Sequence, residues 1–135
     1  MAETRRQTLQ QKRAASAYEQ VNTIPADKSG KEYGSLVRGL PAMIQTDGLA
    51  QALAFLKAKG KGDSSKPHSK AFGHLQSWLN KPEQFAFKDD LFKWLIEQDS
   101  AVYRMVATEA LAYLGWLKRF VEARNLGDVT GNTEE

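Results

Sequence analysis

Apolar residues recur at intervals of three and four along almost the whole chain, which is the spacing of one face of an α-helix. Alternation with a period of two, which is typical of half-buried strands, is almost absent. The pattern predicts an all-α protein, a single-domain helical bundle of about six helices over residues 1–127 with a long central C-terminal helix. Residues 128–135 are polar and acidic, and we expect them to form a disordered tail.

The first half of the chain contains the signals for three helices. The first helix is predicted from Glu3 to about Val21, with apolar residues on one side and basic residues on the other. The second contains Pro41, which should kink it or divide it near Gly39, because proline lacks the N–H of a helical hydrogen bond. Asp47 is the predicted N-cap of the third helix.

A lysine- and glycine-rich run follows the third helix. Residues 57–62 end that helix, and residues 63–66 continue the run as a predicted mobile loop. Pro67 then marks the first turn of a fourth helix, which should stop before Pro82.

Two further helices complete the prediction. The fifth is expected over about 87–95. The sixth and longest should begin near Asp99 or Ser100 and continue to about Asn125, with Gly127 as its terminator.

The predicted C-terminal helix is apolar over most of its circumference. Its narrow polar strip consists of Arg104, Thr108, Lys118, Arg119 and Glu122. Such a helix forms the centre of a bundle, or lends part of its surface to another subunit, and both can hold together. Glu109 lies inside the apolar arc, where an unpaired carboxylate costs several kcal/mol, so we expect it to form a buried pair with a cation or a hydrogen-bond donor.

Composition restricts the class of protein. The chain has 135 residues and no cysteine, which excludes disulfides, thiolate zinc sites and cysteine nucleophiles and fits a reducing compartment. Residues 1–13 lack the apolar stretch of a signal peptide, and no run approaches the length of a membrane span. We therefore expect a soluble, cytoplasmic protein with no membrane partner.

Catalytic groups are hard to find in this sequence. His68 and His74 fall on different sides of a helix, match no metal motif, and are expected to be surface residues. Asp89 and Asp90 are better explained as first-turn partners of the fifth helix dipole than as an acid/base couple. No phosphate-binding glycine loop or nucleophile elbow is present. We predict no enzyme activity, no metal, no cofactor and no small-molecule substrate.

The charge is distributed unevenly between the two parts of the chain. Residues 1–81 carry 13 basic and 6 acidic side chains, whereas residues 82–135 carry 6 basic and 10 acidic ones. Such asymmetry suits a surface that faces a polyphosphate, although solubility alone would also explain it.

Four stretches resemble a known family. They are Lys31–Pro41, Asp47–Gly60, Asp99–Arg104 and Thr108–Phe120, and in order and spacing they are similar to the small helical subunit of type III-B CRISPR effectors, the RAMP-module (Cmr) complexes. Residues 61–90 cannot be aligned to the family pattern, and nothing is carried over to them.

The resemblance implies a helical subunit without nuclease activity that works in antiviral defence. Several copies would stack along a ribonucleoprotein filament with other subunits of the effector complex, lining the channel that holds guide RNA and target RNA. Cleavage would belong to a neighbouring backbone subunit. In such a channel the guide supplies specificity by base pairing, and cations supply affinity for the RNA backbone without reading bases.

The candidate RNA-binding residues are basic side chains of the first part of the chain: Arg5, Arg6, Lys12, Arg13, Lys31, Arg38, Lys57, Lys59 and Lys61. Two alternatives remain open. One is a DNA-binding regulator with a helix-turn-helix, although the third predicted helix offers few groups to base edges. The other is a protein-only adaptor, in which the lysines maintain solubility and the apolar arc binds partner helices.

Overall fold

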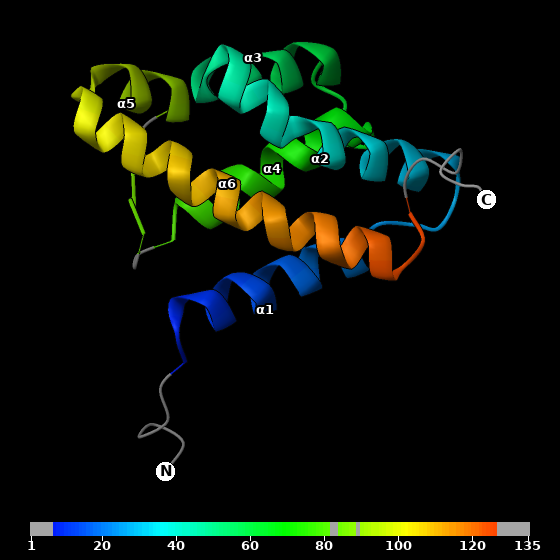
Figure 1. Cartoon of the computed structure of the whole chain (residues 1–135). Coiled ribbons are helices and arrows are strands. Elements are labelled where there is room, and N and C mark those ends of the chain that lie inside the picture. The colour runs from blue at the N-terminus through cyan, green and yellow to red at the C-terminus, as the bar shows by residue number, and fades with distance from the viewer. Residues whose placement is uncertain (1–6, 82–83, 89, 127–135) are drawn as a thin grey trace.

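The computed structural model describes residues 7–81, 84–88 and 90–126. These residues form helices and contain no strand (Figure 1). The helices are α1 (Leu9–Asn22), α2 (Lys28–Asp47), α3 (Leu49–Gly60), α4 (Pro67–Leu79), α5 (Leu91–Glu97) and α6 (Ser100–Ala123). The predicted all-α bundle with a long C-terminal helix is confirmed, whereas the predicted tail 128–135 lies outside the described residues.

Helix α6 crosses the molecule, with α1 packed alongside it and α2 and α4 against its other sides (Figure 1). Helix α3 covers α4 and α2, and α5 lies beside α3 at one end of the bundle. The buried face of α6 consists of Val106, Glu109, Ala110, Tyr113, Leu114, Leu117 and Val121. The apolar width predicted for this helix therefore reflects its central position, because three helices pack around it.

Helix α1 begins later than predicted. Thr8 and Gln11 form a capping box, in which the Thr8 hydroxyl accepts from the Gln11 N–H (3.1 Å) and the Gln11 amide accepts from the Thr8 N–H (2.8 Å). This reciprocal pair of hydrogen bonds fixes the start of the helix at Leu9. The predicted start at Glu3 is wrong for Gln7 and Thr8, and residues 3–6 lie outside the described part of the chain.

Helix α2 is continuous through Pro41, so of the two predicted outcomes, a kink or a division near Gly39, the division is wrong. Proline removes one hydrogen bond, whereas Leu40 and Ile44 on either side of it are buried in the core and hold the helix in place.

Asp47 is the last residue of α2. The prediction that it is the N-cap of α3 is therefore wrong. Gly48, at φ +92°, joins the two helices and donates its N–H to the carbonyl of Ile44 (2.8 Å). The Tyr103 hydroxyl of α6 accepts from the Ala50 N–H (2.9 Å) and so satisfies the first turn of α3. A tertiary contact thus replaces the expected cap.

The later boundaries follow the prediction more closely. Helix α4 has Pro67 in its first turn and ends at Leu79, before Pro82, as predicted. Asp99 caps α6 by accepting from the Val102 N–H (2.9 Å), and the helix ends at Ala123, slightly before the predicted end. Gly127 lies outside the described residues.

Helix α5 is shorter than predicted, because Phe87 precedes it. Asp90 is its N-cap and accepts from the Phe92 N–H (3.0 Å), whereas Asp89 is not described. Ala86, at φ +44°, turns the chain in the left-handed region, so Phe87 enters the core from a loop. In the described ranges, no helix is long and apolar enough to cross a membrane.

Candidate nucleic-acid interface

Glu109 on α6 forms the buried pair that its position predicts. Its carboxylate accepts two hydrogen bonds from the Arg13 guanidinium, from Nε (2.6 Å) and from a terminal nitrogen (2.8 Å). A third comes from the indole N–H of Trp78 (2.9 Å). One α6 side chain therefore binds α1 and α4 at once.

The electrostatics of this pair keep both groups charged. Burial raises the pKa of Glu109, but the hydrogen bonds from Arg13 and Trp78 and the positive charge of Arg13 outweigh it, so the pKa is lowered on balance. The hydrogen bond to Glu109 raises the pKa of Arg13. The Arg13 side chain is only 19% exposed. Because two of its nitrogens already bind Glu109, Arg13 is less suited than the exposed lysines to bind an RNA phosphate.

Tyr113, one turn further along α6, adds a second connection to the same two helices. Its hydroxyl is hydrogen-bonded to Ser16 of α1 (2.9 Å). Its ring stacks on Trp78 of α4, with centroids 5.1 Å apart and planes 3° from parallel. Glu109 and Tyr113 together fix the separation of α1 and α4.

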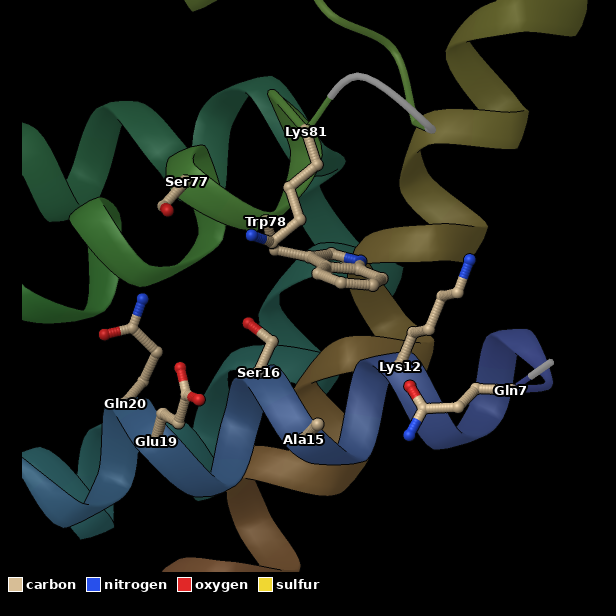
Figure 2. Close-up of a pocket in the computed structure, with 9 residues that line it drawn as sticks. All are labelled: Gln7, Lys12, Ala15, Ser16, Glu19, Gln20, Ser77, Trp78 and Lys81. Carbon is tan, nitrogen blue, oxygen red and sulfur yellow. The ribbon is translucent and has the colours of Figure 1, made fainter. Parts of the chain in front are cut away.

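A polar cleft of about 500 Å³ lies between α1 and α4 (Figure 2). In Figure 2 the Lys81 side chain extends from the end of α4 toward the Trp78 ring, and Lys12 rises from α1 on the other side of that ring. Gln20 and Glu19 also point from α1 toward α4. The residues that line this α1–α4 cleft are Gln7, Lys12, Ala15, Ser16, Glu19, Gln20, Ser77, Trp78 and Lys81.

A second basic region, here called the lysine end, consists of Lys57, Lys59, Lys61 and Lys66 at the end of α3 and in the loop before α4. Burial lowers the pKa of the neighbouring His68, and the positive charges of Lys59 and Lys66 lower it further. Lys57 lies over the Phe72 ring, with Nζ 5.0 Å from its centroid. Three of the predicted RNA-binding lysines, Lys57, Lys59 and Lys61, lie in this region.

Helix α4 connects the lysine end to the cleft. Residues at intervals of three and four share one helix face, and this interval places Lys70, Gly73 and Ser77 on the solvent-facing side of α4. A Cβ at Gly73 would meet no atom within 4 Å, so the space above it is open. We call this face, about 20 Å long at 1.5 Å per residue, the α4 track.

Lys31 and Arg38 lie elsewhere, on the outer face of α2. Both are exposed, and the opposite side of α2 is buried against α4, where Tyr33 contacts His74. The described candidates thus fall at the cleft, at the lysine end and on the outer face of α2, with Arg13 set apart by its pair with Glu109. Arg5 and Arg6 lie outside the described residues.

Sequence reasoning missed Lys66, Lys70 and Lys81 as candidates. Lys70 lies on one face of α4, and Lys66 and Lys81 flank this face at its two ends. The spacing of these lysines relative to one another and to Ser77 predicts the shared face from the sequence alone. Only Lys66 fell in the predicted loop; all three lie within residues 61–90, to which no family alignment carried over a site residue.

His74 is buried, so the expectation of two surface histidines is wrong. Its Nδ1 is 2.7 Å from the Tyr33 hydroxyl. Burial lowers the pKa of His74 to about 4, with Lys70 contributing. Burial also raises the pKa of Tyr33, so a protonated phenol and a neutral imidazole share this hydrogen bond, and the tautomer of His74 decides which of the two donates. Over the described stretches, no cluster of three or more His, Asp or Glu side chains is placed to hold a metal ion.

Comparisons with known proteins agree with one another. The family model described as CRISPR-associated protein (Cas_Cmr5) matches residues 9–124. The CRISPR system Cmr subunit Cmr5 of Thermus thermophilus is 30% identical over 112 residues, covering 82% of this chain and 90% of that protein. The crystal structure of a CRISPR-associated Cmr5 family protein from the same organism has a TM-score of 0.72 at 29% identity, covering 87% of this chain and 97% of the other. The resemblance found in the sequence is confirmed: the chain belongs to the Cmr5 family of CRISPR-associated proteins.

Proposed function

We propose that this protein is a non-catalytic small subunit of a type III-B CRISPR effector complex and that it binds the RNA backbone there in antiviral defence. Family membership supports the assignment to the complex, because the Thermus relative is by name a Cmr subunit. Its partners are the other subunits, further copies of itself, guide RNA and target RNA.

The observation that carries the RNA-binding part is the α4 track, which joins two groups of lysines. Lys12 and Lys81 stand at one end, Lys70 lies along it, and Lys66 of the lysine end lies at its start. Each lysine that neutralises a phosphate releases counterions and adds affinity that is independent of sequence. Lysine is a flexible point charge, which suits contact with a backbone whose bases pair with a guide.

The absence of catalysis is supported by what the polar groups already do. Glu109 and His74 are each engaged in an internal hydrogen bond that holds helices together. The α1–α4 cleft has hydroxyls at Ser16 and Ser77, but no histidine or cysteine among its lining residues, so neither serine has an imidazole base beside it there.

Stacking of copies is supported by apolar side chains left in solvent. Leu9 is 43% exposed and Met105 is 60% exposed, and both line a groove of about 670 Å³ together with Phe85. Gln84 lines the same groove, and its buried amide nitrogen has no hydrogen-bond partner within the described residues. A second copy seated here would cover the exposed apolar side chains of the groove.

The RNA-binding proposal is tested by the salt dependence of affinity for a single-stranded RNA oligomer. Lys12→Ala with Lys81→Ala removes two contacts, and we expect the slope of log K against log salt to fall by about 1.4, since each contact on a single strand contributes roughly 0.7. Lys93→Ala is the control, because the Lys93 ammonium pairs with Glu97 (2.9 Å) on α5.

A third variant, Lys31→Ala with Arg38→Ala, distinguishes the two basic faces. The α4 track is refuted if this α2 variant weakens binding while the Lys12→Ala, Lys81→Ala variant leaves affinity and slope unchanged. If no variant changes RNA binding, the protein-only adaptor is the better description.

A further inference from the structure

We infer that the α1–α4 cleft binds a single unstacked nucleotide of the RNA strand, with its base inside the cleft and its phosphate at the rim, within reach of Lys12 or Lys81. The inference rests on the proposed function and says what the RNA does at one end of the α4 track. The cleft would add a contact to a base, whereas the lysines of the α4 track contact only the RNA backbone.

The chemistry of the cleft lining suits a nucleobase edge. Gln7 and Gln20 each carry an amide that both donates and accepts, and Glu19 accepts from amino or imino groups. Nucleobases present these donors and acceptors on edges that are free only when the base is unpaired. The two ammonium groups of Lys12 and Lys81 supply the attraction for the attached phosphate.

Size and polarity distinguish this cleft from the groove beside Met105. Its volume of about 500 Å³ lies within the range of roughly 300–1,000 Å³ for small-ligand sites. An apolar helix would leave the amides, hydroxyls and carboxylate of this lining without partners. A base has polar edges, and so matches the polar groups of the lining.

The two walls are already held in place before any ligand arrives. Arg13 of α1 and Trp78 of α4 bind the same Glu109 carboxylate, and Ser16 binds Tyr113, on which Trp78 is stacked. Trp78 is only 1% exposed, so it acts as a fixed floor and not as a free stacking surface. A preformed cleft avoids the entropy cost of ordering its walls, which favours binding of a single nucleotide.

The test compares two single-stranded RNA oligomers with the same backbone, one intact and one made of abasic residues. Their phosphate charge is identical, so any difference in affinity for the full chain comes from the bases. We expect the abasic oligomer to bind about tenfold more weakly, the order of effect found for single base contacts. Ala15→Phe fills the cleft and keeps every lysine, so it should bind both oligomers with the affinity that the wild type has for the abasic one.

Ala42→Phe, on an exposed position of α2, is the matched control and should retain the full difference between oligomers. Thermal midpoints of both phenylalanine variants verify that they fold. The nucleotide site is overturned if the wild type binds both oligomers equally, or if Ala15→Phe weakens both by the same factor. If Lys12→Ala with Lys81→Ala also leaves both affinities unchanged, the proposed binding of the RNA backbone at this end of the track is refuted together with the nucleotide site.

Discussion

Replacing Glu109 by alanine tests how the bundle is held together, because this one carboxylate connects three helices. The substitution removes the acceptor of both Arg13 hydrogen bonds and of the Trp78 N–H. It leaves the indole N–H buried without a partner and leaves the guanidinium only 19% exposed to water.

The cost follows from these two losses. Removing one member of a buried ion pair costs roughly 3–5 kcal/mol, and partial access of Arg13 to water places this case at the lower end. We therefore expect the free energy of unfolding to fall by about 3 kcal/mol for Glu109→Ala, and by about 1–2 kcal/mol for Glu109→Gln, which keeps one oxygen for Trp78. For a chain of this size, a loss of 3 kcal/mol lowers the thermal midpoint by about 10–15 °C.

Urea unfolding followed by circular dichroism measures these values, and the double variant with Arg13→Ala completes a cycle that isolates the coupling between the two residues. Glu97→Ala is the control, since its pair with Lys93 is exposed and should contribute less than about 0.5 kcal/mol. A loss for Glu109→Ala no larger than that of the control would refute the view that Glu109 holds α1 and α4 together.

The same pair predicts a pH dependence. Burial raises the pKa of Glu109, but Arg13 and Trp78 lower it by more, so the folded value lies below the ordinary value of 4.5. A carboxyl with a lowered folded pKa contributes its full stabilisation above the unfolded pKa and loses it as pH falls through the folded one. The difference in stability between wild type and Glu109→Gln should be constant near neutral pH and shrink below about pH 4.5.

Four further substitutions test other parts of the structure. Because burial lowers the pKa of His74 to about 4 from 6.5, the folded state resists protonation, and stability should drop by about 2 kcal/mol between pH 7.5 and 5; denaturant titrations of His74→Gln should lack that drop. Thr8→Ala removes the cap of α1 and should cost about 1 kcal/mol, with loss of helix signal confined to α1 by hydrogen exchange. Gly39→Ala, in open space inside α2, should raise the thermal midpoint by the equivalent of about 0.5–1 kcal/mol, whereas Gly30→Ala should lower it, because a Cβ there would collide with the Pro25 carbonyl.

Local signals located most of the helices from sequence, and tertiary contacts explain where they failed. The start of α4 at Pro67 and its end before Pro82 depend on proline, and the Asp99 cap depends on adjacent residues, so these boundaries were predictable. The α2–α3 junction was not, because its donor is satisfied by Tyr103, more than 50 residues away. Likewise, the tendency of Pro41 to break α2 was outweighed by the core packing of its neighbours Leu40 and Ile44.

The candidate site was predictable only in part. Charge asymmetry along the chain pointed to the basic first part, and Glu109 within an apolar arc predicted a buried pair. Its partner Arg13 could not be separated from the free cations, because the two lie 96 positions apart in sequence. His74 gave no sign of burial, since its neighbour Tyr33 comes from another helix.

The most direct test of RNA binding along α4 is photocrosslinking of 4-thiouridine-labelled target RNA within the assembled native complex, followed by mass spectrometry of the crosslinked peptides. We expect crosslinks to this chain in residues 7–20 and 66–81, which carry the α1–α4 cleft and the α4 track, with loss of the former in the Lys12→Ala, Lys81→Ala variant. Crosslinks confined to the outer face of α2, around Lys31 and Arg38, or none to this chain, would contradict the account.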